Sequence, residues 1–289
     1  MFNSNQKINI KKHPYPYIII ENFFEEAFYK NLKNNFPNES EFGEQPNKIN
    51  RMHHDTSFGD NLYNKLILNS PEYKKLHEYI YSKNFIKDYV DIFKKDIQSE
   101  IDLKNLNNIF KYKFAEKALE KNKIFNKNDI KKSDNENGYL YSRIDLGMGR
   151  KNYGLVNGGK GIHVDNPQRL ISMIFYIGGF KKIEGGEFRV WEKKNNEMKI
   201  SETITPKDNL MIVSLQKNNS YHDVNPVTEI EGTRNAFYIA ISSNVKIWKN
   251  LKENNFNKTF NKNRYAFKEK TKINFIIKKI YEKFFQNKE

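Results

Sequence analysis

The sequence contains no cysteine, few arginines and no long apolar run, and each of these shortages excludes a class of protein or a kind of site. Without cysteine, disulfides and thiolate metal sites are excluded, so histidines and carboxylates are the metal ligands on offer. No apolar run approaches the length of a membrane span, and the first twelve residues are polar. We therefore expect no secretory signal and a cytoplasmic location.

The excess of positive charge is carried almost entirely by lysine. The formal net charge is +15, yet only 7 of the 50 basic residues are arginines. Proteins that bind nucleic acids usually need arginine for two-pronged contacts with phosphates and base edges, so we expect no nucleic-acid partner. Five arginines fall within residues 139–243, where planar geometry is expected to matter: Arg143, Arg150, Arg169, Arg189 and Arg234.

The length of 289 residues favours one domain with appendages. We divide the chain into a lead-in with a helical insert (1–138), a core (139–243) and a basic extension (244–289). The extension holds 13 Lys and Arg against 4 Glu, and its apolar residues recur at helical spacing. We expect a terminal helix that docks on the domain, with peripheral contact with an acidic membrane surface as the alternative. The sequence leaves the oligomeric state open.

The lead-in begins with alternating prolines and aromatics and then a β-branched run, which predicts a strand ending near Ile20. Asn22 is the expected cap of a helix that Pro37 closes, and residues 38–60 are expected to form a loop. Ser70 and Pro71 mark another helix start, and the pattern stays mostly helical to about residue 132, including a stretch around 110–119.

The core contains several short apolar segments separated by Gly, Asn and Pro. We expect strands at residues 139–145 (ended by 146–149), 170–177, 188–191, 198–204, 210–215 and 235–241. Short strands at this spacing predict a sandwich or barrel rather than parallel β/α units.

Three side chains have the composition of a metal site. His163 and Asp165 are two apart, and residues i and i+2 of an extended strand point to the same face. His222 follows 59 residues after His163 (222 − 163), directly behind an apolar run. Two histidines and one carboxylate that leave other positions open are typical of non-haem Fe(II) oxygenases. A second pair, His53 and Asp55, has no apolar strand after it, so we expect a loop there, on the surface or bordering a substrate mouth.

The ordered series His163-x-Asp165, His222 and Arg234 resembles the Fe(II)/2-oxoglutarate dioxygenases, in particular the prolyl 4-hydroxylase-like branch. The string HVDNP at 163–167 and the string GGEF at 185–188 extend the likeness, which covers residues 139–243 well and 14–37 more weakly. The resemblance implies a mainly β protein with flanking helices (α+β), whose core is a double-stranded β-helix, a cupin-like jelly roll.

The resemblance also implies roles for individual residues. His163, Asp165 and His222 would hold Fe(II), and Arg234 would bind the far carboxylate of the cosubstrate 2-oxoglutarate. Ser172 and Tyr176 would help to hold this cosubstrate. The strand at 139–145 departs from the pattern, since it offers Ile144 or Asp145 where a cosubstrate-binding tyrosine can occur, with Tyr141 and Arg143 nearby. O2 is the implied oxidant, and ascorbate is a candidate further cofactor.

The implied activity is hydroxylation, because halogenating relatives lack a carboxylate at the position of Asp165. Decarboxylation of 2-oxoglutarate to succinate and CO2 would accompany it. The alternative is a non-oxidative jelly-roll protein that binds a metal or a sugar, and Arg234 favours the enzyme over this alternative. The substrate is left open between small molecules and peptidyl groups.

Overall fold

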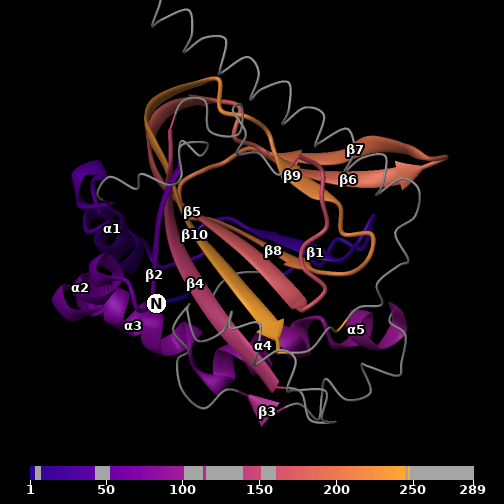
Figure 1. Cartoon of the computed structure of the whole chain (residues 1–289), viewed down its shortest axis with the longest axis horizontal. Helices are drawn as coiled ribbons and strands as arrows, with labels where there is room; N and C mark the ends of the chain where they lie inside the picture. Colours follow the sequence, from indigo (N-terminus) through magenta and orange to yellow (C-terminus); the bar gives the residue numbers. More distant parts are fainter. Residues whose placement is uncertain are drawn as a thin grey trace, which may run out of the picture.

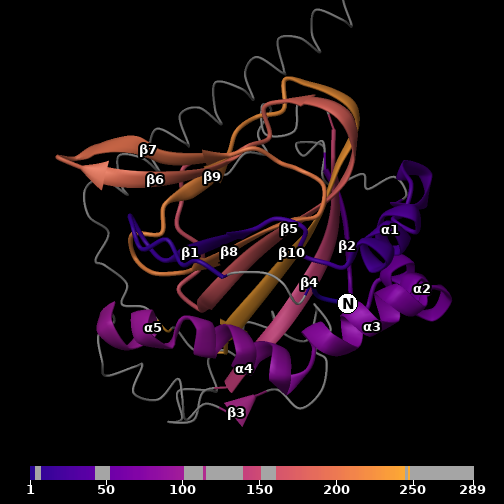
Figure 2. The same cartoon turned by 180° about the vertical axis from the view of Figure 1, so that it is seen from behind.

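Two antiparallel β-sheets face each other and build the core of a computed structural model that describes residues 1–3, 8–42, 53–100, 113–114, 139–150, 161–244 and 247. Helices cover the side of the large sheet that faces away from the small sheet (Figures 1 and 2). This is the jelly roll that the strand spacing and the family resemblance predicted.

The large sheet has the strand order β1-β8-β5-β10-β4-β2, and a short strand β3 pairs with β4 in parallel. Its strands are β1 (Tyr17–Ile20), β2 (His53–Ser57), β3 (Lys113–Phe114), β4 (Tyr139–Gly149), β5 (Arg169–Glu184), β8 (Leu210–Leu215) and β10 (Glu229–Ser243). The small sheet has the order β7-β6-β9, with β6 (Phe188–Lys194), β7 (Glu197–Ile204) and β9 (His222–Val224).

The described helices are amphipathic, and two of them begin with a serine cap. The helices are α1 (Glu26–Asn34), α2 (Asn61–Asn69), α3 (Pro71–Ile80), α4 (Lys83–Ile92) and α5 (Lys94–Glu100), with a 3-10 turn η1 (Glu39–Phe42) after α1. The Ser70 hydroxyl accepts a hydrogen bond from the Tyr73 amide at 3.5 Å, and Pro71 occupies the first turn of α3. Ser82 caps α4 in the same way through the Phe85 amide. The predicted helix start at Ser70 and Pro71 is thus confirmed.

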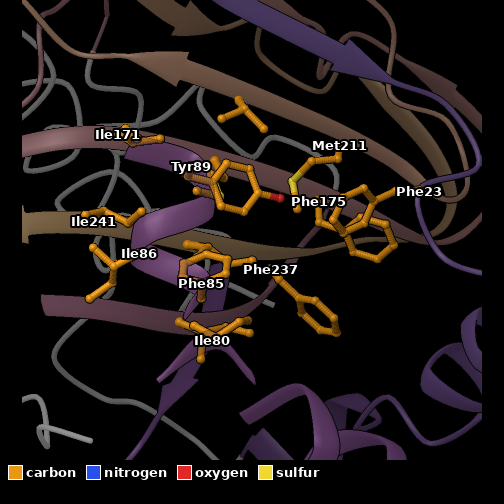
Figure 3. Close-up of a cluster of buried hydrophobic side chains, with 14 of the residues drawn as sticks. Phe23, Ile80, Phe85, Ile86, Tyr89, Ile171, Phe175, Met211, Phe237 and Ile241 are labelled. Carbon is orange, nitrogen blue, oxygen red and sulfur yellow. The ribbon is translucent and has the colours of Figure 1, made fainter. Parts of the chain in front are cut away.

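The period of two along the strands separates two apolar layers. Odd-numbered residues of β5 such as Met173 and Phe175 pack with Phe237 of β10 against the helices, and Phe85 and Tyr89 of α4 meet them there (Figure 3). The opposite face of the large sheet carries Tyr176 towards the small sheet. The helices therefore complete one core, and the interior between the two sheets forms a second one.

Several predicted boundaries were wrong, in each case because tertiary pairing outweighs the local signal. Asn22 was expected to cap α1, but it lies in a turn with φ 50°, and Glu25 precedes the helix without a side-chain cap bond. The strand expected to end at residue 145 continues through Gly149, because β10 and β2 pair with it on both sides. The second pair, His53 and Asp55, lies in edge strand β2 rather than in a loop.

Other strands are also longer than the sequence predicted, and one strand was not predicted. β5 and β10 are longer than the segments 170–177 and 235–241, and β9 was not expected at all. Around 110–119, where a helical stretch was expected, residues 113–114 form β3. The other residues of that stretch and nearly all of the 244–289 extension lie outside the described residues, so the three-part division stays a prediction. Within the described part of the chain, no helix is long and apolar enough to cross a membrane.

We predict that Phe175→Ala lowers the free energy of unfolding by about 3–5 kcal/mol, because it leaves a cavity in the helix-facing core. The Phe175 side chain is fully buried, and its ring centroid lies 4.8 Å from that of Phe24 and 5.6 Å from that of Phe237. Urea unfolding followed by circular dichroism measures the change. Leu68→Ala is the control, since Leu68 is 83% exposed and should shift stability by less than about 0.5 kcal/mol. Equal stability of the two variants would contradict this packing.

Candidate metal centre

The two histidines of the predicted triad are brought together by backbone pairing. The His163 amide donates to the His222 carbonyl at 3.0 Å, and the His222 amide donates back to the His163 carbonyl at 2.9 Å. Residues that exchange both bonds in an antiparallel pair project their side chains from the same face. The imidazole centroids accordingly lie 4.5 Å apart.

Asp165 completes the group. Its carboxylate oxygens lie 3.7 Å from His163 Nε2 and 3.9 Å from His222 Nε2. One ligand atom from each of the three residues lies within 4.8 Å of the others. Adjacent ligands at about 2.1 Å from one metal ion lie roughly 3 Å apart, so a small contraction would let the three bind a single ion. The residues present therefore fit the metal that the family resemblance implies.

The orientation of each imidazole is set by a carbonyl two residues earlier in the chain. Nδ1 of His163 lies 2.8 Å from the Gly161 carbonyl oxygen, and Nδ1 of His222 lies 2.9 Å from the Ser220 carbonyl oxygen. A carbonyl can only accept a hydrogen bond, so each Nδ1 carries the proton and each Nε2 keeps its lone pair. Both Nε2 atoms face Asp165, as metal ligands must.

Asp165 is fixed by the turn that follows it and by the next strand. The Asn166 side-chain oxygen accepts from the Gln168 amide, which forms the short turn into β5. Asp165 Oδ2 then accepts hydrogen bonds from the Ser172 hydroxyl at 2.5 Å and from Arg169 at 3.3 Å. The carboxylate is almost completely buried and is held in one orientation.

Ser172 therefore has a visible structural role beside Asp165. The family resemblance assigned it to the cosubstrate, and this assignment stays a prediction. Asp165 itself lies outside a strand, although the argument from spacing placed it in one. The two side chains still converge, with Asp165 Oδ1 3.7 Å from Nε2 of the bridge residue His163.

A polar network behind His222 fixes the three-residue strand β9 to β6. The Arg189 guanidinium forms a two-pronged ion pair with Asp223, with N–O distances of 2.8 and 2.5 Å, and the Trp191 indole donates to the same carboxylate at 2.8 Å. The Asp223 carboxylate raises the pKa of Arg189 through this hydrogen-bonded pair. Arg189 also donates to Asn225, which in turn donates to Glu187. Sequence reasoning missed this network, apart from expecting planar geometry at Arg189.

The two glycines of the string GGEF at 185–188 lie in close contact with the backbone of the segment after β9. A Cβ at Gly185 would lie 1.9 Å from the Pro226 carbonyl oxygen, and Gly185 has φ 82°. Only glycine allows the chain between β5 and β6 to approach the segment after β9 so closely. The Gly186 amide then donates to the Asn225 carbonyl at 3.0 Å.

Arg234 lies fully buried between the two sheets. Its guanidinium nitrogens lie 3.1 Å from the Tyr176 hydroxyl and 3.0 Å from the Tyr238 hydroxyl, and its Cζ lies 4.8 Å from the centroid of the Tyr176 ring. Burial raises the pKa of Tyr176, and Arg234 counteracts this shift, so the phenol stays protonated. Tyr238 was missed in the sequence, although residues 234, 236 and 238 share one face of a strand.

The strand β4 has no phenol at the two positions that departed from the family pattern. Ile144 is buried in the helix-facing core, and Asp145 forms an ion pair with Arg143 at 2.5 Å. Tyr141 is buried as well, and burial raises its pKa.

Two histidines and one carboxylate with open positions are the ligand types found in non-haem Fe(II) oxygenases, and here they occur in a jelly roll that buries an arginine between its sheets. Residues 149–241 match the family described as the 2OG-Fe(II) oxygenase superfamily. The match lies within the part of the chain, residues 139–243, that carries the sequence resemblance. A comparison with curated protein sequences finds no match.

Solved structures similar to this chain include three prolyl hydroxylases. A prolyl 4-hydroxylase from Phytophthora capsici is 16% identical with a TM-score of 0.42, over 78% of this chain and 58% of that chain. A prolyl hydroxylase from Trichoplax adhaerens, solved with a hypoxia inducible factor peptide, is 13% identical with a TM-score of 0.42, over 78% and 83% of the chains. A viral collagen prolyl hydroxylase from Paramecium Bursaria Chlorella virus-1 is 13% identical with a TM-score of 0.40, over 78% and 94%. The chain thus spans less than two thirds of the Phytophthora protein.

We predict that Arg189→Lys weakens divalent metal binding by about tenfold or more, because a lysine cannot hold Asp223 with two parallel bonds and β9 carries His222. Isothermal titration with Mn(II) measures the affinity. Lys199→Ala is the control, since Lys199 forms an exposed ion pair with Glu197 on the same sheet. An unchanged affinity in Arg189→Lys would show that the network does not position His222.

Proposed function

We propose that the protein is an Fe(II)- and 2-oxoglutarate-dependent hydroxylase. The observation that carries this proposal is the convergence of His163, Asp165 and His222 in the same sheet interior that buries Arg234. When bound, Fe(II) with 2-oxoglutarate and O2 would supply the oxidising chemistry, which yields succinate, CO2 and a hydroxylated product. Ascorbate is proposed only as an accessory reductant.

The protein side chains would bind and orient the reactants. His163 and His222 present Nε2 lone pairs, and Asp165 adds a negative charge, so a divalent cation is the ligand that this group favours. Three protein ligands leave further positions open for a bidentate cosubstrate and O2. The carbonyl and hydroxyl partners of the three ligands hold these atoms in place before a metal arrives.

Arg234 would bind the distal carboxylate of 2-oxoglutarate. A guanidinium matches a carboxylate with two parallel hydrogen bonds, and burial makes this attraction stronger than at the surface. The side chains of Tyr176 and Tyr238 hold the guanidinium in a fixed orientation. Because Arg234 and Tyr176 are fully buried, the entry of a diacid requires the surrounding side chains to move apart.

The substrate is proposed to be a small molecule or a peptidyl group. The alternative, a non-oxidative protein that binds a metal or a sugar, would not need a buried guanidinium between the sheets. No contact among the described residues favours this alternative over the hydroxylase.

We predict that His163→Ala abolishes succinate release, because a metal ligand is lost, whereas Arg234→Lys raises the KM for 2-oxoglutarate about 10- to 100-fold, the range expected when a charged hydrogen bond is removed. The assay measures succinate in the presence of Fe(II), 2-oxoglutarate and O2, with circular dichroism to confirm folding. Lys181→Ala, in an exposed ion pair, is the control. Turnover of the same size in all these proteins would contradict the proposal.

A further inference from the structure

Tyr15 is buried in the same interior cluster as Phe188, whose ring centroid lies 5.4 Å from that of His222. The segment that carries Tyr15 is held at several points: Lys11 and Tyr17 exchange backbone hydrogen bonds of 2.9 Å, the Leu215 amide donates to the Pro16 carbonyl at 3.0 Å, and the Asn219 side chain donates to the Pro14 carbonyl at 3.1 Å. The backbone on both sides of Tyr15 is therefore fixed, and so is the position of its ring.

The sheet register places Tyr15 on the interior face, next to a polar row that leads to Asp165. β1 pairs Tyr17 with Ser214, and the same register continued by two residues places Tyr15 opposite Gln216. Gln216 Nε2 donates to the Ser214 hydroxyl at 2.9 Å, and Ser214 donates to the Ser172 carbonyl at 3.2 Å. The Ser172 hydroxyl then donates to Asp165, so this row ends at the metal ligand.

The Tyr15 hydroxyl is buried and has no hydrogen-bond partner within the described part of the chain. The side-chain oxygen of Gln216 is also buried and also lacks a hydrogen-bond partner among the described residues. Other tyrosine hydroxyls of the protein have partners: Tyr29 donates to the Ile177 carbonyl, Tyr73 donates to the Leu32 carbonyl, and Tyr17 donates to Glu202. A buried hydroxyl without an acceptor costs stability, and a phenylalanine would fill the same space without that cost.

The charge environment shows what kind of group would satisfy this hydroxyl. Burial raises the pKa of Tyr15, and the charges of Tyr17 and Asp165 raise it further, so the phenol keeps its proton and acts as a donor. Tyr15 packs in the same interior cluster as Tyr176, which contacts Arg234. Tyr15 thus shares its cluster with one residue that contacts the buried guanidinium and with another, Phe188, that contacts His222.

We propose that Tyr15 is a cosubstrate-binding residue whose hydroxyl donates a hydrogen bond to the carboxylate of 2-oxoglutarate that binds at the metal. This inference rests on the proposed function. Arg234 would bind one end of the diacid, and Tyr15 would bind the other end next to Asp165. The hydrogen bond that is missing without the cosubstrate would then form when the cosubstrate binds.

The test is Tyr15→Phe in the full chain loaded with Mn(II), with 2-oxoglutarate titrated by isothermal calorimetry under anaerobic conditions. We expect affinity for 2-oxoglutarate to fall about tenfold or more, as the loss of a donor to a charged acceptor predicts, while the affinity for Mn(II) stays unchanged. The melting temperature without 2-oxoglutarate should be equal to or higher than that of the wild type, because no hydrogen bond is lost.

Tyr73→Phe is the matched control, because it removes a buried hydroxyl that bonds to a backbone carbonyl at 3.0 Å in the helix-facing layer. We expect it to lower the melting temperature and to leave 2-oxoglutarate affinity unchanged. Equal 2-oxoglutarate affinity in Tyr15→Phe and wild type would overturn the inference. A loss of Mn(II) affinity in Tyr15→Phe would also overturn it, because the hydroxyl would then serve Asp165. If the wild type binds Mn(II) but not 2-oxoglutarate, the proposed function itself fails.

Discussion

The backbone bridge between His163 and His222 is the interaction on which the metal centre depends. Its two hydrogen bonds, 3.0 and 2.9 Å long, join segments that are 59 residues apart (222 − 163). One side of the bridge leads through a turn into β5, and the other side is β9 of the small sheet. The bridge therefore links the two sheets at the point where the ligands converge, and the sheet pairing itself sets the distance between the imidazoles.

Each of the three candidate ligands is oriented by hydrogen bonds, either from the adjacent chain or from a neighbouring strand. Both imidazoles are oriented by the carbonyl two residues earlier, which is a local arrangement that needs no distant partner. Asp165 depends on a hydroxyl from the following strand, and β9 depends on the Arg189–Asp223 pair. Positioning thus comes partly from the chain next to each ligand and partly from neighbouring strands, so the site is organised before any metal binds.

The order of His163, Asp165, His222 and Arg234 made the convergence of the three candidate ligands and the jelly roll predictable, because ligand chemistry restricts residue types so strongly. Tyr238 was also within reach of prediction, since it lies on the face of Arg234 in one strand. The strand β9 was not predictable, because three residues carry too weak a periodicity and their pairing partner lies 34 residues away (223 − 189). The prediction that Asn22 caps the first helix was wrong. A good capping residue does not decide where a helix begins when contacts with the sheet fix the chain around it.

The need to satisfy buried N–H groups explains why tyrosines, rather than only apolar side chains, lie beside Arg234. A hydroxyl accepts a hydrogen bond from the guanidinium and satisfies an N–H group without cancelling its positive charge. Burial keeps the Tyr176 phenol protonated, so its proton remains available for donation to an anion. An incoming carboxylate can then be bound by the guanidinium and by hydroxyl donors together, in an interior of low polarity where such interactions are strong. The Tyr176 ring lies against the guanidinium and is fully buried with it, so water is excluded from their contact.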